Sequence, residues 1–452
     1  MQTEREFAIE VVRRLQQAGF EALFAGGCVR DELLGLEPAD YDVATNARPE
    51  QVRAIFRNVV EVGVAFGVIE VIGPRLPEGG HLMIQVATFR SDGEYLDGRR
   101  PVDVTFCTAE KDAQRRDFTI NGMFFDPIAS KLYDYVGGQH DLEVAVLRAI
   151  GDPRERIKED KLRMLRAARM AMRFDLRIEP ATHEAIRALA KEITIVSPER
   201  IADELRKMLV HPRRAEGMHL LEELSLLAPI LPEVAQMKSV PQGTPSARTG
   251  DLWTHVVKVL EMLEGPTWPT TQPVSFELAF GTLLHDIGKP LTFVASSEKY
   301  SFHGHEHAGK DVAKRIGRNL KLSNDERARI EFLVEKHQYL CDAPIMRASK
   351  LKPILVHPGI GELLALHKAD SLASGREIAH VEFCERLLRE TPESVLNPPP
   401  LITGDDLTAR GLKPGPLFKQ LLDAVRESQL EGTITTATEA MEMVEKTMEA
   451  KS

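Results

Sequence analysis

The sequence has little cysteine, few aromatic residues and no long apolar run. Four cysteines occur among 452 residues, and no two of them have the C-x-x-C spacing. They support neither a disulfide framework nor a zinc-thiolate site and are typical of reduced thiols in the cytoplasm. No stretch approaches the roughly 18 uncharged apolar residues of a membrane-spanning helix, and acids near the N-terminus argue against a secretory signal. We therefore expect a cytoplasmic chain that does not bind a membrane.

The charge balance is acidic, with 58 Lys plus Arg against 68 Asp plus Glu and a formal net charge of −10. The hydrophobic fraction of 43% provides for real cores, so global disorder is excluded. The acid surplus by itself disfavours nucleic acid, because phosphates are bound by Lys and Arg. Residues 160–214, however, hold 13 Lys plus Arg and 8 Asp plus Glu. This stretch predicts a local, salt-sensitive contact with nucleic acid.

The pattern of elements changes along the chain from mixed α/β to helical. Short β-rich runs alternate with turns in the first part, whereas long helical periodicity follows Asp152-Pro153. The segment 241–246 is rich in proline and glycine and is typical of a linker. We predict four parts: an α/β head over 1–150, an elongated all-helical neck over 151–240, a helical body over 250–375 and a helical tail over 376–452.

A glycine pair and two aspartates form the first candidate site. Gly26 and Gly27 follow a short apolar run, so their backbone N–H groups can approach a phosphate, and Arg30 can add a charged fork. Asp40 and Asp42 alternate along an extended segment, which directs both carboxylates to the same face. Two carboxylates this close repel each other unless a divalent cation lies between them. Mg²⁺ bound there can bridge triphosphate oxygens.

Two arginine-rich strings supply further candidates. The first is Arg-Arg-Asp at 115–117 and contains Arg116. In the second, charged residues recur every three positions, which predicts neighbours on one helix surface: Asp160, Arg163, Arg166 and Arg169. Acids that would balance these arginines are nearly absent from that helix.

Together the three strings resemble the class II tRNA nucleotidyltransferase and bacterial poly(A) polymerase family, within the polymerase-β-like superfamily. Four other segments resemble the same family, at 87–90, 97–101, 134–142 and 197–201. The resemblance covers about residues 20–240 and implies a nucleotidyltransferase head with a mixed sheet. A tail segment, Gly-Leu-Lys-Pro-Gly-Pro-Leu at 411–417, is similar to the tail of these enzymes and implies a tRNA-binding role, with a plain packing hairpin as the alternative.

The resemblance implies roles for the candidate residues. Asp40 and Asp42 would hold Mg²⁺ while the 3′-hydroxyl of the tRNA acceptor arm attacks the α-phosphorus of a nucleoside triphosphate and pyrophosphate leaves. The nucleotide-binding set would comprise Gly26, Gly27, Arg30, Arg116, Asp160, Arg163, Arg166 and Arg169. Two departures stand out, because the family commonly has a glutamate where this chain has Gln85 and an alanine where it has Gly122.

Asp160 and Arg163 are implied to act as a protein template for the base. An aspartate only accepts hydrogen bonds and an arginine only donates them. Cytosine and adenine both present an amine donor beside a ring-nitrogen acceptor, whereas uracil and guanine present the reverse order. Mismatched polar groups reject a ligand strongly. One such pair therefore favours CTP and ATP over GTP and UTP.

The body contains an ordered series of histidines and aspartates. This series resembles the HD metal-dependent phosphohydrolase domain, in which side chains from separate helices hold one or two divalent metals that activate water. The resemblance implies a divalent transition metal in addition to the Mg²⁺ of the head. The implied ligands are His255, His285, Asp286, His305, His337 and Asp370, with His305 preferred over its neighbours His303 and His307 because Gly309 follows at the expected spacing.

The leading hypothesis is an enzyme that adds and repairs the 3′-terminal CCA of tRNA from CTP and ATP without a nucleic-acid template. A poly(A) polymerase is the alternative within the family, but the apolar stretch 62–69 replaces the basic string expected of it. An A-only tRNA-tailing enzyme stays open, as do a principal activity in the HD domain and a non-catalytic RNA-binding module. The segment 90–115 is a hypothetical lever for the switch from C to A, and the sequence leaves the oligomeric state open.

Overall fold

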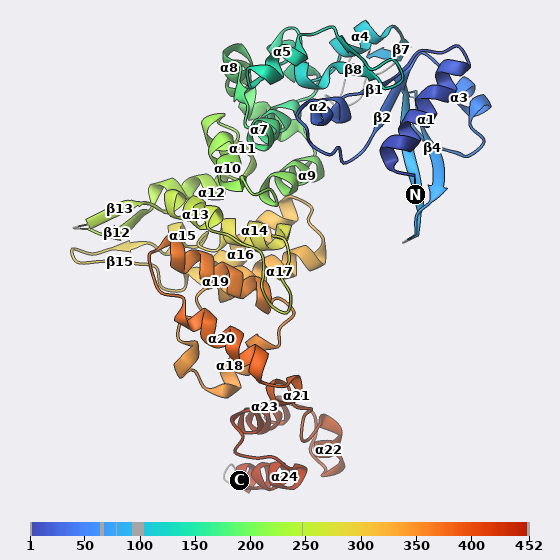
Figure 1. The fold of residues 1–452 in the computed structure, drawn as a ribbon. Helices are drawn as coiled ribbons and strands as arrows, with labels where there is room; N and C mark the ends of the chain where they lie inside the picture. Colours follow the sequence, from blue (N-terminus) through green and yellow to red (C-terminus); the bar gives the residue numbers. More distant parts are fainter. Residues whose placement is uncertain (1, 64–66, 78, 93–103, 246, 450–452) are drawn as a thin grey trace. The chain divides into compact units, whose positions relative to one another are not determined.

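The computed structural model describes residues 2–63, 67–77, 79–92, 104–245 and 247–449. The chain divides into two compact units, Met1–Ile230 and Leu231–Ser452 (Figure 1). Of the segments that carry the family resemblance, 97–101 lies outside the described residues, as do positions 64–66 of the apolar stretch and 93–103 of the hypothetical lever. Within the described residues, no helix combines the length and the apolarity that crossing a membrane requires.

A seven-stranded sheet organises the first unit, with the strand order β3-β4-β5-β2-β1-β8-β9. Strands β2 and β5 pair in parallel and the other neighbours pair antiparallel, so the predicted mixed sheet is confirmed. The strands are β1 (Ala22–Ala25), β2 (Asp42–Thr45), β3 (Val59–Gly63), β4 (Val68–Arg75), β5 (His81–Thr88), β8 (Met123–Asp126) and β9 (Lys131–Asp134). A separate antiparallel pair consists of β6 (Arg90–Asp92) and β7 (Val104–Phe106).

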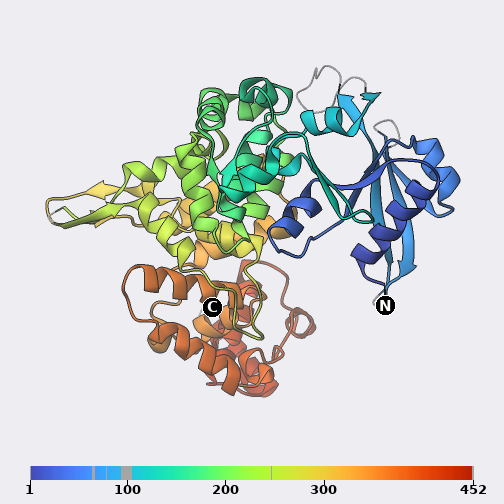
Figure 2. The ribbon, with the colours of Figure 1, turned by 45° about the horizontal axis from the view of Figure 1, so that its top comes forward.

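Helices cover both faces of this sheet. Helix α1 (Glu4–Gln17) begins at a capping box made by Thr3 and Glu6 and buries an apolar stripe against β1, β2 and β5 (Figure 2). Alternate residues of β1 point to opposite faces: Phe24 joins the core under α1, whereas Leu23 packs with α4 (Ala109–Gln114). Two further helices of the head are α2 (Gly27–Leu33) and α3 (Pro49–Ile55).

The rest of the first unit is mainly helical. Its helices are α5 (Gly138–Glu143), α6 (Pro153–Glu159), α7 (Arg163–Phe174), α8 (Pro180–Leu189), α9 (Pro198–Leu209), α10 (Arg214–Glu223) and α11 (Leu227–Ile230). Helix α7 packs against α9 and α10 through a fully buried apolar face. A short parallel pair, β10 (Val146–Leu147) with β11 (Arg177–Ile178), lies among these helices, which the sequence did not predict.

The prediction that Asp160 shares a helix with the three arginines is wrong. Helix α6 ends at Glu159, Asp160 is extended with φ −145°, and α7 begins at Arg163. The carboxylate of Asp160 accepts a hydrogen bond from the backbone N–H of Leu162 at 3.0 Å. Such a local side-chain bond competes with helical backbone bonding and favours a break. The predicted neighbours therefore meet across a turn instead of along one helix.

The second unit consists mainly of helices. The helices that carry its candidate site are α13 (Leu252–Glu261), α14 (Phe276–Leu284), α15 (Lys289–Thr292), α16 (His305–Asn319), α17 (Asn324–Lys336) and α19 (Ile360–Ala373). The others are α12 (Pro232–Gln236), α18 (Ala348–Leu355), α20 (Ala379–Glu390), α21 (Glu393–Leu396), α22 (Gly404–Ala409), α23 (Pro416–Glu431) and α24 (Ala437–Glu449). The last three of these share a small apolar cluster of their own.

The linker expected at 241–246 is instead part of a β-hairpin, β12 (Pro241–Thr244) with β13 (Ala247–Asp251). Pro241 fits an edge strand because it needs no partner for an N–H. The pairing register shifts between Pro241 and Gly243, and Gly243 has φ +87°, which favours glycine. This hairpin lies beside a second one, β14 (Val294–Ala295) with β15 (Tyr300–Ser301) (Figure 1).

Candidate functional site

One cavity of about 640 Å³ in the first unit collects every candidate residue that the sequence placed in the head and neck. Its lining includes residues of strands β2 and β5, of the turn after β1 and of helix α7. The ten predicted residues on its wall are Gly26, Gly27, Arg30, Asp40, Asp42, Arg116, Asp160, Arg163, Arg166 and Arg169. Tertiary folding thus brings together three strings that are far apart in the sequence.

The paired carboxylates lie where β2 begins. Burial and the negative charge of Asp40 raise the pKa of Asp42 to about 6, against the opposing effect of Arg116. Asp42 lies opposite Gln85 in the parallel pairing of β2 with β5, and Gln85 lines the same cavity. The amide at Gln85 adds no negative charge, so the donor set is two carboxylates. A divalent cation between them would offset both burial and repulsion, and carboxylate oxygens are ligands that Mg²⁺ prefers.

The glycine turn brings the backbone close to an arginine. Gly26 has φ +72°, a conformation that residues with a Cβ rarely adopt. A Cβ on Gly26 would also lie 2.8 Å from Nη1 of Arg116. Gly27 then begins α2, whose first N–H groups have no partner within the helix, and both glycines line the cavity. The backbone conformation therefore favours glycine at position 26, and a larger residue there would also displace the Arg116 guanidinium.

The arginines of the cavity are held by acids, some from distant segments of the chain and some local in sequence. Arg166 donates two hydrogen bonds to Asp117, at 2.8 and 2.6 Å, and Arg169 contacts Glu204 on α9 at 2.5 Å. Arg30 and Arg116 are paired in the same way with Asp31 at 2.6 Å and with Asp112 at 3.0 Å. The acids that the arginine-rich helix lacks are thus supplied by the tertiary structure. None of these four acids was selected from the sequence as a site residue, although Asp31 follows Arg30 directly and Asp117 belongs to the Arg-Arg-Asp string.

Asp117 accepts hydrogen bonds from Arg166, from Asn121 and from the backbone N–H of Phe118. Burial alone would raise the pKa of its carboxyl, but the charge of Arg166 and the hydrogen bond from Asn121 hold that pKa well below its usual value. Asn121 also accepts a hydrogen bond from Arg30 at 2.5 Å. One network therefore connects the glycine-turn arginine with the arginine of helix α7.

The template pair is positioned by residues of its own. Arg200 on α9 donates to both oxygens of Asp160, at 3.2 and 2.7 Å. Arg163 donates from Nη1 to Glu159 at 2.6 Å and from Nη2 to the carbonyl of Arg115 at 3.2 Å. The Nε–H of Arg163 has no partner within the described residues. The carboxylate of Asp160 has about four lone-pair sites, so it can accept a further hydrogen bond besides those from Arg200. The pair can therefore still present one acceptor and one donor to a base.

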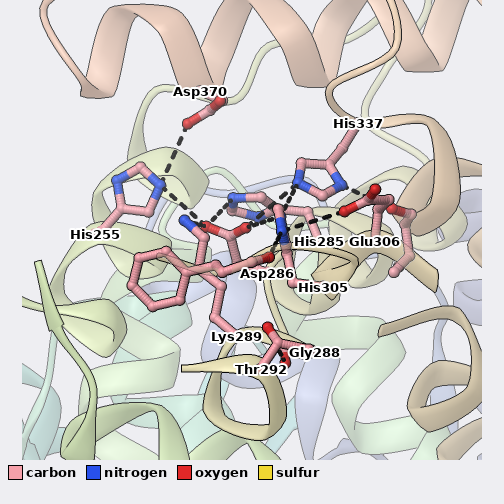
Figure 3. A network of polar contacts seen from close by, with 12 residues as sticks. His255, His285, Asp286, Gly288, Lys289, Thr292, His305, Glu306, His337 and Asp370 are labelled. Carbon is pink, nitrogen blue, oxygen red and sulfur yellow. Dashed lines mark hydrogen bonds and ion pairs between the residues drawn. The ribbon is translucent and has the colours of Figure 1, made fainter. Parts of the chain in front are cut away.

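The second unit brings all six predicted ligands of the body together in one cluster (Figure 3). Asp286 lies at its centre, with Nε2 of His285, His305 and His337 at 3.3, 3.2 and 3.3 Å from its oxygens. His255 lies 3.7 Å from Asp286 and 3.3 Å from Asp370. The expected preference for His305 is consistent with the geometry, since the side chain of His307 is 75% exposed.

The hydrogen bonds of the histidines indicate a metal. The Nδ1 atoms of His285, His305 and His337 lie 2.7, 2.9 and 2.7 Å from backbone carbonyl oxygens. A carbonyl only accepts, so each Nδ1 carries a proton, and in the neutral imidazole each Nε2 then presents a lone pair toward Asp286. Nε2 of His305 and Nε2 of His337 nevertheless face each other at 3.2 Å. Two lone pairs at this distance repel unless a cation lies beside them.

Two further observations support a metal at this cluster. Within the described residues, the buried Nε2 of His285 and Oδ1 of Asp286 have no hydrogen bond of acceptable geometry. Asp286 also belongs to two triads whose ligand atoms all lie within 4.8 Å of one another, close enough to hold a metal ion. The first triad contains His255 and His285, and the second contains His305 and His337. Burial would raise the pKa of Asp286, but Lys289 and His285 hold it well below its usual value, so the central ligand is ionised.

A cavity of about 580 Å³ gives access to this cluster. His255, Asp286 and Asp370 line it together with the cations Lys258, Lys289 and Arg376. Lys289 contacts Asp286 at 2.6 Å. The sequence analysis did not select Lys289, although it follows Asp286 by three positions. Cations around a metal cluster favour an anionic substrate such as a phosphate.

Three family descriptions match the chain. Residues 22–148 match the Poly A polymerase head domain, residues 175–238 match the probable RNA and SrmB-binding site of polymerase A, and residues 252–391 match the HD domain. These segments hold the glycine turn with the carboxylates, Arg200, and the metal cluster, respectively.

Known proteins with three different activities are similar to the chain. An A-adding tRNA nucleotidyltransferase of Deinococcus radiodurans is 32% identical over 94% of this chain and 95% of that protein. Poly(A) polymerase I of Salmonella typhi is 41% identical over 51% of each chain, so this chain spans about half the length of that relative. The crystal structure of a Bacillus stearothermophilus CCA-adding enzyme in complex with CTP covers 100% of this chain and 99% of its own, with a TM-score of 0.69 and 25% identity.

Proposed function

Because the chain belongs to the family of tRNA nucleotidyltransferases and bacterial poly(A) polymerases, we propose that it adds and repairs the 3′-terminal CCA of tRNA. The substrates are CTP and ATP, pyrophosphate is released, and no nucleic acid serves as template. The observation that carries this proposal is the single cavity that holds two paired carboxylates together with an acceptor–donor pair. The first feature suits nucleotidyl transfer and the second suits a choice between bases.

In this reaction Asp40 and Asp42 would hold the divalent ion, which we assign as Mg²⁺. Members of nucleotidyltransferase and HD families typically use divalent metals, and Mg²⁺ would supply charge neutralisation at the triphosphate and a lowered pKa of the attacking hydroxyl. Gly26 and Gly27 let the backbone approach the phosphates, with Arg116 beside them. Arg30 is only 4% exposed and paired with Asp31, so its contribution is to shape the pocket and its field.

Base selection follows from Asp160 and Arg163. Arg200 orients the carboxylate of Asp160, and Glu159 orients the guanidinium of Arg163. An acceptor and a donor held in this order pair with cytosine or adenine and leave uracil or guanine with two mismatched groups. Arg166 and Arg169 are held by Asp117 and Glu204. These ion pairs fix both side chains in the wall of the pocket, where we expect them to contact phosphates or help to orient the base.

The same argument assigns roles to the parts of the chain. The head over 1–150 performs the transfer, the neck over 151–240 reads the base and binds RNA, and the tail over 376–452 binds the tRNA. The partner is the acceptor arm of tRNA, and the reaction belongs in the cytoplasm, where tRNA and both triphosphates meet.

A second candidate is A-only addition to tRNA. The relative that matches nearly the full length of the chain bears that activity in its name, whereas the CCA-adding enzyme bound to CTP matches in fold over the full length at 25% identity. The template pair accepts both C and A, so it does not separate the two candidates.

One experiment separates them. The full chain is incubated with three tRNAs that lack CCA, CA or A, and with CTP, ATP or both, and product lengths are read at nucleotide resolution. The proposal expects two C and one A on the shortest tRNA. Addition of A only to tRNA that already ends in CC would establish the second candidate, and long A tracts would indicate a poly(A) polymerase.

The metal cluster supports an additional activity as a metal-dependent phosphohydrolase in the second unit. Its carrying observation is the convergence of four histidines and two aspartates beside a cation-lined cavity. Replacing His285 by Ala should remove hydrolysis of a phosphate ester and spare nucleotide addition. Loss of both activities in a folded variant would contradict two separate sites.

A further inference from the structure

We propose that Cys341, His367 and His380 form another metal site, for a thiophilic divalent ion such as Zn²⁺. One donor atom of each residue lies within 4.8 Å of the other two. The three residues come from separate segments: the turn after α17, helix α19 and the start of helix α20. No C-x-x-C or H-x-x-H spacing connects them, which is why the sequence showed no zinc-thiolate pattern.

The hydrogen bonds of the two histidines leave nitrogens available for a metal. Nε2 of His367 lies 3.3 Å from the carbonyl oxygen of Lys336, so this nitrogen carries the proton and Nδ1 presents the lone pair. Ligand histidines in proteins are commonly oriented by such a carbonyl. His380 has a buried Nε2 with no hydrogen-bond partner within the described residues. An unpaired buried nitrogen is unfavourable, and a metal ion would satisfy it.

The donor set selects the class of metal. A thiolate with two imidazoles suits Zn²⁺ or Co²⁺ and does not suit Mg²⁺, which prefers oxygen. Tetrahedral Zn²⁺ with bonds of about 2.0–2.3 Å holds its donors roughly 3.3–3.7 Å apart. The donors lie within 4.8 Å of one another, and the exposed Cys341 on its turn can adjust to these separations. Binding releases the thiol proton to solvent, and a water supplies the fourth ligand.

The local charge does not oppose this assignment. Arg376 acts electrostatically on Cys341 and on His380. Its guanidinium, however, contacts Oδ2 of Asp370 at 2.7 Å, which offsets its charge. Asp342 adds a negative charge next to the thiol.

The site would stabilise the neighbouring metal cluster. Cys341 follows His337 within the same turn region, and His367 precedes Asp370 by about one helical turn on α19. A metal held by Cys341 and His367 would thus fix the two segments that carry His337 and Asp370. The ligands of that cluster include no sulfur, so the two sites can be distinguished by spectroscopy.

The test uses the full chain, stripped of metal and titrated with Co²⁺. Thiolate ligation gives an intense sulfur-to-cobalt charge-transfer band in the near ultraviolet, which nitrogen and oxygen ligands do not give. We expect this band in the unaltered protein and in Cys107→Ser, and its loss in Cys341→Ser. We also expect it to persist in His285→Ala, which removes a ligand of the other cluster. A missing band in the unaltered protein, or a band that survives in Cys341→Ser, would overturn the proposal.

A second measurement follows the thiol itself. Cys341 is exposed, and its alkylation by iodoacetamide is read by peptide mass spectrometry. One equivalent of Zn²⁺ beyond what the other cluster binds should slow this alkylation at least tenfold, whereas Mg²⁺ should not. His380→Gln, shown by circular dichroism to be folded, should lose the protection. Equal alkylation rates with and without Zn²⁺ would refute the site.

Discussion

Arg200 is predicted to control base selection without touching the base. It donates hydrogen bonds to both oxygens of Asp160. Without Arg200 that carboxylate can rotate out of the orientation in which it accepts from the amine of cytosine or adenine. Arg200→Met removes the fork and the charge, whereas Arg200→Lys keeps the charge and loses the two-point contact. Both variants should therefore weaken discrimination against UTP and GTP.

The magnitude follows from the contact. Hydrogen bonds to charged groups contribute about 1.5–3 kcal/mol. The two side chains are 22% and 17% exposed, so solvent screening favours the lower half of that range. At about 1.4 kcal/mol per factor of ten, kcat/KM for CTP and ATP should fall roughly 10- to 50-fold in Arg200→Met. The fall in Arg200→Lys should be smaller, because the charge still attracts Asp160.

The assay measures kcat/KM for each of the four triphosphates on tRNA that lacks its 3′ end. A matched control is Arg206→Met, which removes an arginine from the same helix that contacts the exposed Asp203 at 2.8 Å. We expect the control to keep both rate and selectivity. If Arg200→Met lowered kcat/KM for all four triphosphates equally, or lost activity only because its melting temperature fell, the orienting role would be wrong.

Three further predictions concern the carboxylates. The pKa of Asp42 is raised to about 6, so its ionisation opposes folding of the metal-free protein. As the pH rises from 4 to 7, the metal-free protein should therefore lose up to about 3 kcal/mol of stability relative to Asp42→Asn. Urea unfolding in the presence of EDTA measures this change. The affinity for Mg²⁺ should rise over the same pH interval, because protons compete with the metal. If neither the free energy of unfolding nor the Mg²⁺ affinity changed with pH, the raised pKa would be contradicted. Asp117→Asn should lower the free energy of unfolding by about 1–3 kcal/mol, since it removes the charged partner of Arg166, whose side chain is 35% exposed. Adding Arg166→Met should recover part of this loss in a double-mutant cycle. Additive losses would count against the coupling. Asp286→Asn should reduce the metal content of the full chain, measured by plasma mass spectrometry, while the rates of CTP and ATP incorporation stay within about twofold. A metal content equal to that of the unaltered protein would show that Asp286 is not a ligand.

Much of the fold was predictable because its local signals agree with each other. Among the β-rich runs of the first part, those at 68–72 and 82–89 lie almost entirely in β4 and β5, and residues 59–63 form β3. The helical character of the later part is likewise local, since it follows from hydrophobic periodicity. The linker prediction failed where proline and glycine belong to an edge strand with a bulge, which composition alone does not distinguish from an irregular connection.

The sequence by itself determined the types of residue available for chemistry: paired aspartates after a glycine turn, an arginine-rich stretch and an ordered set of histidines. Only the tertiary structure decided which groups meet. Asp160 leaves the helix because its carboxylate caps Leu162 and is held by Arg200, and the arginines of α7 find their acids in Asp117 and Glu204. Such pairings join residues distant in sequence, and their energy depends on burial and on distances of a few ångströms. Neither quantity is fixed by local pattern, so both arise only when the chain folds.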